Sequence, residues 1–236
     1  MQKACRNGEI HGRISFVFSN REPGEATQTD RFFDLVRSYN IPLVCLSHKP
    51  FKITAEERDW RTAYDREVDK KIAPFSPDLC VLAGYMLIVS EVLCQKYDMV
   101  NLHPAPPGGP AGSWQEVIRN LIKTKSDTAG AMMHLVTPEL DRGPVVSYCV
   151  FPIKGEPFAE YWRKGDKDML FQLIRRHELV REFPLIIMTL QALSRGDVMV
   201  KNKKVIDARG NPIGGYDLSS KVDAVVKESC NEADLF

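Results

Sequence analysis

The sequence predicts an α/β protein with three layers, built on a mostly parallel, Rossmann-like sheet that ends in an antiparallel C-terminal part. Apolar, β-rich runs alternate with segments of helical spacing over the first half of the chain, as in parallel sheets joined by helices. The run 78–83, DLCVLA, is apolar throughout, which is typical of a strand covered on both faces. Two further β-rich runs, 130–136 and 144–151, are separated only by TPELDRG, which predicts an antiparallel hairpin.

The elements of the first half follow from spacing and from stop signals. In the segment 55–73, Trp60, Tyr64, Val68 and Ile72 recur every four residues and share one helix face, and two prolines follow. The other predicted elements are, in order, a helix end near 2–9, strands at 13–19 and 42–46 with a helix between them, a short helix near 91–97, and a strand that ends at 103.

The second half contains two clear helix signals. Ser113 and Glu116 have the spacing of a capping box, in which each side chain bonds the backbone of the other residue at the start of a helix. A long helix is predicted at 168–193, ended by Gly196, and Pro184 inside it should kink or divide it. We expect one main domain at 1–196, followed at 197–236 by a small hairpin and a polar tail.

Composition limits the class of partner. The 236 residues carry 32 Lys and Arg against 31 Asp and Glu, a formal net charge of +1, so no global field favours nucleic acid or an acidic membrane surface. No apolar run approaches the roughly 20 residues that span a bilayer, and the N-terminus lacks the apolar core of a signal peptide. We expect small-molecule substrates, a cytoplasmic location, and a monomer or homodimer.

The six cysteines are scattered, with no C-x-x-C pair, and several lie inside apolar runs, as reduced cysteines used as small apolar residues do. We therefore expect a reducing compartment and no metal site.

Three polar residues stand at the ends of predicted strands: Asn101 and His103 in NLHP, and Asp141 in ELDRGP. Histidine offers acid and base chemistry near neutral pH, asparagine a hydrogen-bond donor, and aspartate a partner that orients the imidazole. Each motif alone also fits an ordinary turn. Because no serine or cysteine lies in a recognisable nucleophile motif, direct group transfer is favoured over a covalent enzyme intermediate.

The segments DLCVLAGYMLIVS, NLHPAPPGGP and GAMMHLVTPELDRGPVV, in this order, resemble the formyltransferase family that uses 10-formyltetrahydrofolate. The resemblance covers about residues 10–195. It implies the formyltransferase fold and transfer of a formyl group to the amine of glycinamide ribonucleotide, in purine biosynthesis, through a tetrahedral intermediate. It also implies that Asn101, His103 and Asp141 are the catalytic residues, and that His134 is a structural neighbour of the site.

By the same resemblance, the folate lies against two segments. These comprise Tyr85, Met86, Leu87, Ile88 and Val89, and the loop residues Val136, Thr137, Glu139 and Leu140. The family usually has F-M-R-I-L in the first segment, so Leu87 stands in place of an arginine. We expect the pocket to persist, because the family contacts there are largely apolar and main-chain.

The acceptor side departs further from the family pattern. Arg61 matches a phosphate-binding arginine, Pro104 begins the loop over the acceptor, and Glu178 is an imperfect match to a substrate-contacting glutamate. The family opens with a strand and a G-x-G-S-N loop whose backbone amides bind phosphate, and this sequence has neither. We expect the sheet to lack its usual first strand, either because those residues lie upstream or because the sheet is rebuilt.

Four alternatives remain open. In the first, the formyl acceptor is another amine, such as an amino sugar. In the second, the acceptor is water, which would make the protein a formyltetrahydrofolate hydrolase. A non-enzyme alternative is a folate-binding remnant with weak turnover. A methionyl-tRNA formyltransferase is disfavoured, because it would need a basic RNA-binding domain after the long helix.

Overall fold

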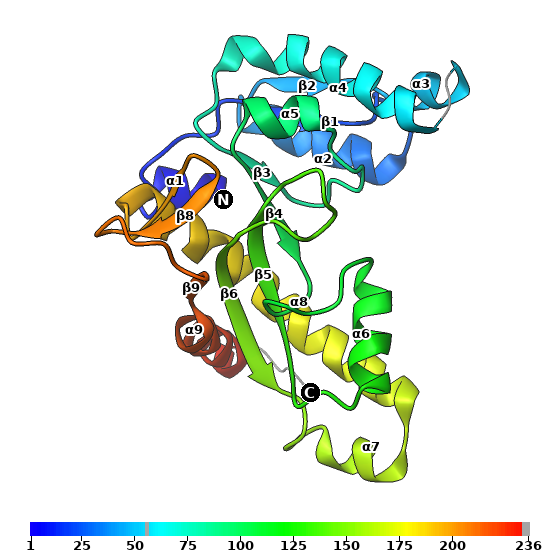
Figure 1. Ribbon diagram of the computed structural model, residues 1–236, viewed down its shortest axis with the longest axis vertical. Coiled ribbons are helices and arrows are strands. Elements are labelled where there is room, and N and C mark those ends of the chain that lie inside the picture. Colours follow the sequence, from blue (N-terminus) through cyan, green and yellow to red (C-terminus); the bar gives the residue numbers. More distant parts are fainter. Residues whose placement is uncertain (55–56, 233–236) are drawn as a thin grey trace.

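The computed structural model describes residues 1–54 and 57–232 and has an α/β architecture (Figure 1). β1 (Val17–Ser19) and β2 (Leu43–Cys45) form a parallel pair. A five-stranded sheet has the order β3-β4-β5-β6-β9, formed by Cys80–Leu82, Met99–His103, Thr128–Leu135, Val145–Pro152 and Tyr216–Asp217. Its β4–β5 and β5–β6 pairs are antiparallel, and its two outer pairs are parallel.

The predicted α/β class with a mixed sheet is confirmed, but the strands do not form one continuous sheet. Within the described residues, no backbone hydrogen bond joins β1 to β3, so the two sheets are held together by side chains. The rings of Phe18 and Tyr85 have centroids 6.3 Å apart, and both border an apolar cluster that includes Trp60 and Met99. The sheet is divided because no described strand lies between β1 and β3 to continue the ladder.

The helices agree with most of the sequence predictions. They are α1 (Gln2–Arg6), α2 (Thr27–Ser38), α3 (Lys49–Thr54), α4 (Glu57–Ile72), a 3₁₀ turn η1 (Ala73–Phe75), α5 (Glu91–Lys96), α6 (Trp114–Lys123), α7 (Ala159–Lys164), α8 (Lys167–Arg195) and α9 (Ser219–Glu232). Residues 55–56 of the predicted helix 55–73 lie outside the described residues. Pro184 does not divide α8, because Leu185 and Ile186 next to it are buried against the core and hold the helix together.

Helix α8 covers one face of the five-stranded sheet. Val100 and Leu102 of β4 and Met133 of β5 pack in the same apolar cluster as Leu185 of α8. Successive side chains of a strand point to opposite faces, so the intervening residues of β4 and β5 project from the face turned away from α8. This alternation separates the apolar core from the polar residues singled out in the sequence.

The C-terminal part contains more structure than the sequence predicts. β7 (Val198–Lys201) and β8 (Lys204–Asp207) form the predicted antiparallel hairpin. The following residues, predicted to be a polar tail, supply β9 to the sheet and form α9, which packs on α8 and β6 (Figure 1). The helix was missed because its apolar face is narrow, although Val222 within it is fully buried.

Within the described residues, no helix is long and apolar enough to cross a membrane.

Candidate active site

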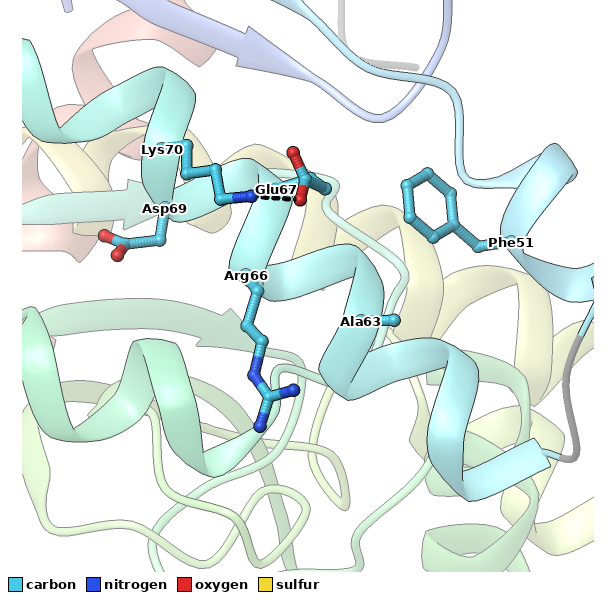
Figure 2. Close-up of a pocket in the computed structure, with 6 residues that line it drawn as sticks. All are labelled: Phe51, Ala63, Arg66, Glu67, Asp69 and Lys70. Carbon is cyan, nitrogen blue, oxygen red and sulfur yellow. Dashed lines mark hydrogen bonds and ion pairs between the residues drawn. The ribbon is translucent and has the colours of Figure 1, made fainter.

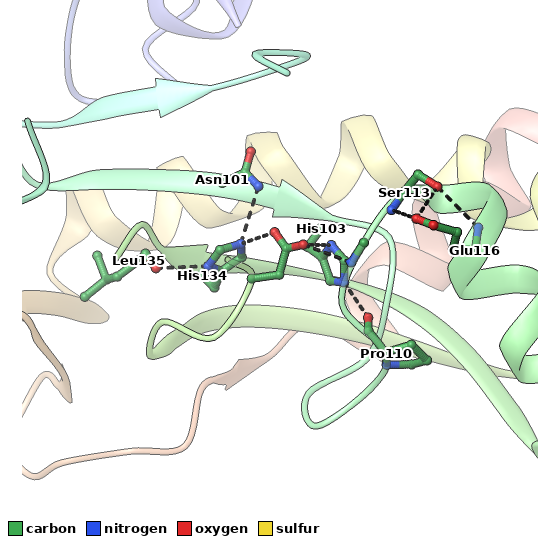
Figure 3. A network of polar contacts seen from close by, with 9 residues as sticks. Asn101, His103, Pro110, Ser113, Glu116, His134 and Leu135 are labelled. Carbon is green, nitrogen blue, oxygen red and sulfur yellow. Dashed lines mark hydrogen bonds and ion pairs between the residues drawn. The ribbon is translucent and has the colours of Figure 1, made fainter. Parts of the chain in front are cut away.

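The polar residues of β4 and β5 meet at one end of the five-stranded sheet (Figure 3). Asn101 and His103 are two positions apart on β4 and therefore share a face. The antiparallel register pairs Asn101 with His134 on β5. The turn between β5 and β6 then brings Asp141 over the same face, so residues 40 positions apart in sequence become neighbours.

His103 is buried and both of its ring nitrogens face acceptors. Its Nε2 lies 2.8 Å from the carbonyl oxygen of Pro110, and its Nδ1 lies 3.5 Å from Oδ2 of Asp141. A carbonyl oxygen only accepts, so Nε2 carries a proton and donates it, which leaves Nδ1 as the nitrogen turned toward Asp141. An imidazolium donates from both nitrogens and satisfies both acceptors.

His134 orients the amide of Asn101. Its Nδ1 lies 2.9 Å from the carbonyl oxygen of Leu135 and must donate to it, so its Nε2 is an acceptor. Burial lowers the pKa of His134, which keeps the ring neutral. Nε2 lies 3.4 Å from Nδ2 of Asn101 and accepts one of its two N–H groups. This contact fixes the direction in which the amide of Asn101 points.

The turn that carries Asp141 tolerates no larger residue at Gly143. A Cβ atom at Gly143 would lie 1.7 Å from the carbonyl oxygen of Leu135. Asp141 itself has a left-handed backbone, with φ of 54°, a conformation that aspartate adopts more readily than most residues. The side chain of Asp141 is only 8% exposed and sits between His103 and His134.

The loop after β4 touches the catalytic candidates from the other side. The backbone N–H of Gly112 donates to Oδ2 of Asp141 over 3.1 Å. The predicted capping box at the start of α6 is confirmed: the backbone N–H of Ser113 donates to Oε2 of Glu116 over 2.8 Å, and the backbone N–H of Glu116 donates to Oγ of Ser113. The residues that cap α6 thus lie beside the site, a place that the local helix signal does not indicate.

The segments predicted to hold the folate expose apolar side chains. Met86 is 80% exposed, Ile88 37% and Leu140 49%. Val89, the last residue of the first segment, is buried, and the backbone N–H of Ser90 next to it donates to the buried carboxyl of Asp65 over 2.6 Å. The exposed side chains of Met86 and Ile88 therefore lie on a segment whose end is fixed by the burial of Val89 and by the hydrogen bond of Ser90.

The other residues of these two segments are partly covered or support the loop. Tyr85, Leu87 and Val136 border the apolar cluster that contains Met99, and Thr137 donates its hydroxyl to the carbonyl oxygen of Glu139 over 3.1 Å.

The predicted acceptor residues are more dispersed. Pro104 directly follows His103. Arg61 lies on α4, half-buried, with its guanidinium 5.6 Å from the ring centroid of Trp60. Glu178 lies on α8, is fully buried, and both carboxyl oxygens lack a hydrogen-bond partner. Its nearest described cation is Arg175, with 3.7 Å between Nη1 and Oε2.

A separate surface cavity of about 430 Å³ lies along α4 (Figure 2). Its lining residues are Phe51, Ala63, Arg66, Glu67, Asp69 and Lys70. Glu67 is paired with Lys70 at 2.6 Å and Asp69 with Lys96 at 2.7 Å. None of the predicted site residues lines this cavity, so it is not the candidate active site.

Among the described residues, no group of three histidine, cysteine, aspartate or glutamate side chains is arranged to hold a metal ion.

A family model described as formyl transferase matches residues 1–160. The chain is 31% identical over 152 residues to phosphoribosylglycinamide formyltransferase of Escherichia coli (strain K12), an alignment that spans 64% of this chain and 65% of that protein. It is 25% identical over 218 residues to the Haemophilus influenzae protein of the same name, covering 90% and 89%. A formyltetrahydrofolate deformylase of Haemophilus influenzae is 27% identical over 144 residues, covering 59% and 48%.

Solved structures give the same fold. Glycinamide ribonucleotide transformylase 1 from Symbiobacterium toebii superposes with a TM-score of 0.67 at 22% identity, covering 87% of this chain and 85% of that one. A formyltetrahydrofolate deformylase from Pseudomonas syringae has a TM-score of 0.57, also at 22% identity, and covers 87% and 59%.

The chain belongs to the formyl transferase family. It is a formyltransferase-type enzyme similar to the glycinamide ribonucleotide transformylases, as the resemblance of its three motifs implied.

Proposed function

We propose that this protein transfers a formyl group from 10-formyltetrahydrofolate to the primary amine of glycinamide ribonucleotide, a step of purine biosynthesis. The observation that carries the proposal is the cluster at one end of β4 and β5, in which His103 faces Asp141 at 3.5 Å and His134 lies between Asn101, at 3.4 Å, and Asp141, at 3.7 Å. These groups supply a neutral donor, an acid and a carboxylate within a few ångströms.

The chemistry assigned to these residues is a direct transfer. The acceptor amine attacks the formyl carbon, and negative charge develops on the formyl oxygen. The second N–H of Asn101 and the positive charge of the protonated His103 imidazole stabilise that charge. Asp141 holds the imidazole and takes part in moving a proton from the attacking amine to the folate nitrogen that departs.

The formyl donor fits the exposed apolar side chains of Met86, Ile88 and Leu140. A flat folate ring buries such groups, while the backbone of the loop 136–140 is suited to its polar edge. The acceptor is assigned to the side of Pro104 and Arg61, whose charge suits a phosphate. Glu178 belongs to this assignment only through its position in the sequence pattern, because its carboxyl is enclosed in the protein.

The test is a formyl-transfer assay with purified protein, 10-formyl-5,8-dideazafolate and glycinamide ribonucleotide, followed by the absorbance of the deformylated product. Release of the formyl group that depends on the ribonucleotide supports the proposal. Substituting His103→Ala should lower kcat by about 10²–10³ while the Kd for the folate stays within about tenfold, since the imidazole acts mainly in the transition state.

Two other results would redirect the proposal. Formyl release that proceeds equally without any amine indicates water as acceptor, which is the reaction named for the deformylase relatives. Folate binding without release under any condition contradicts catalysis and favours a binding protein. An equal loss of folate affinity and turnover in the His103→Ala variant contradicts the role given to the imidazole.

A further inference from the structure

The loop between β4 and α6 contacts both members of the His103–Asp141 pair through its backbone. The carbonyl oxygen of Pro110 accepts from Nε2 of His103, and the amide of Gly112 donates to Asp141. These two contacts select which imidazole nitrogen faces the carboxylate and fix where the carboxylate sits. A backbone group has no rotamer of its own, so its direction depends on how the loop is held.

The end of this loop is held by the capping box. Oε2 of Glu116 accepts from both the backbone N–H and the hydroxyl of Ser113, over 2.8 and 2.7 Å (Figure 3). A Cβ atom at Gly112, where φ is 112°, would lie 2.8 Å from the same oxygen. The glutamate carboxylate therefore lies against the residue whose amide holds Asp141.

The rest of the loop transmits this constraint. Ala105 at its start is fully buried in the cluster that also contains Val117 and Ile118 of α6. Prolines at 104, 106, 107 and 110 fix φ at four of the intervening positions. The loop is therefore anchored at its start by Ala105 and at its end by the cap, so the cap decides where Pro110 and Gly112 lie.

We propose that Ser113 and Glu116 are positioning residues for formyl transfer, which act through the backbone of Pro110 and Gly112 to hold His103 and Asp141 in the reactive arrangement. The inference rests on the proposed function of that pair. The role given to Ser113 and Glu116 is additional to the proposed function, because neither residue touches the reacting atoms and because a capping box alone is an ordinary helix signal.

The structure offers a matched control. Asp166 caps α8 by accepting from the backbone N–H of Met169 over 3.0 Å and contacts neither His103 nor Asp141. Loss of either cap weakens one helix end by a similar amount. The body of α6 stays in place, because Val117, Ile118, Leu121 and Ile122 are buried. The variants Ser113→Ala and Asp166→Ala therefore remove helix caps of similar strength, but only Ser113→Ala removes a cap that holds the loop in contact with His103 and Asp141.

The experiment compares four variants in the transfer assay: Ser113→Ala, Ser113→Thr, Glu116→Ala and Asp166→Ala. Ser113→Ala and Glu116→Ala should lower kcat about tenfold or more, with KM for the folate within about twofold, since small displacements of reacting groups reduce rate more than binding. Ser113→Thr keeps the hydroxyl that accepts from the Glu116 backbone and donates to the Glu116 carboxylate, so it should retain most of kcat, and Asp166→Ala should match the unsubstituted protein. A purely structural role would lower kcat equally in Ser113→Ala and Asp166→Ala.

A second readout does not depend on activity. Hydrogen exchange of the Gly112 amide, measured by NMR, should become faster in Ser113→Ala and Glu116→Ala and stay unchanged in Asp166→Ala. Unchanged exchange, or a kcat no lower than that of Asp166→Ala, overturns the inference. If the unsubstituted protein transfers no formyl group, the proposed function fails, and the exchange measurement alone decides whether the cap holds Asp141. If Ser113→Ala does not fold, Glu116→Ala decides, because the Ser113 hydroxyl is then intact.

Discussion

The β5–β6 turn and the middle of α8 each enclose one carboxyl group, and the protein surrounds them differently. Asp141 faces the Gly112 amide at 3.1 Å and two imidazoles at 3.5 and 3.7 Å. Glu178 has no hydrogen-bond partner for either oxygen, although it is fully buried. Its neighbour Arg175 pairs more closely with Glu182, at 2.6 Å.

The two carboxyl groups are both shielded from solvent, but they differ in the hydrogen-bond donors around them. Burial raises the pKa of Glu178 to about 8, so its carboxyl is kept neutral and adds to the core as a polar but uncharged group. Asp141 instead sits where donors converge, as a carboxylate that orients a base must. The catalytic candidates are thus preorganised, whereas Glu178, expected from the sequence pattern on the acceptor side, is enclosed.

The largest effect should come from removing the charge of Asp141. Asp141→Asn keeps the shape of the side chain but loses the carboxylate that holds His103, so we expect kcat to fall by about 10²–10³ with the Kd for folate nearly unchanged. Rapid-mixing kinetics and a folate titration measure the two separately. Asp207→Asn, in the exposed β7–β8 hairpin region, is the control and should keep full activity. If kcat of Asp141→Asn fell only slightly, the charge of Asp141 would have no part in the transfer step.

A smaller effect is expected at Arg61, which should affect binding of the acceptor and leave the rate of the transfer step unchanged. Arg61→Ala should raise KM for a phosphorylated acceptor about tenfold, because a charge-assisted contact to phosphate is lost, while kcat and the KM for folate change little. Arg66→Ala, on an exposed position of the same helix, serves as control. An unchanged acceptor KM would remove Arg61 from the substrate site.

The smallest effect on activity is expected at Glu178, whose contribution is to stability. Between about pH 4.5 and about pH 8 the unfolded chain ionises this carboxyl while the folded protein keeps it protonated. The folded state then binds more protons, so the free energy of unfolding falls as pH rises, by at most about 1.4 kcal/mol per pH unit. Glu178→Gln should remove this slope and stabilise the protein near the upper end of the range.

Urea unfolding at several pH values measures that slope, with the exposed Glu228→Gln as control. Parallel pH profiles for the unsubstituted protein and Glu178→Gln would mean that Glu178 titrates normally. That result would also remove the contrast with Asp141.

Much of the fold and part of the site follow from local sequence. The capping box, the β5–β6 and β7–β8 hairpins and the α/β class were all predicted, because each depends on residues close together in the chain. The polar residues Asn101, His103 and Asp141 were selected because they follow apolar strands. Helix α9 was missed, since its mixed composition hides a helix that forms by packing on α8 and β6.

The sequence by itself determined which polar groups stand near the strand ends: two short motifs supply Asn101, His103 and Asp141, and strand periodicity places the first two on one face of β4. Only the tertiary structure decided how these groups are held. The Pro110 carbonyl, the Gly112 amide and the His134 acceptor are defined by long-range register and loop closure, and no local pattern encodes such contacts. The enclosure of Glu178 and the division of the sheet are likewise set by packing between elements distant in the chain.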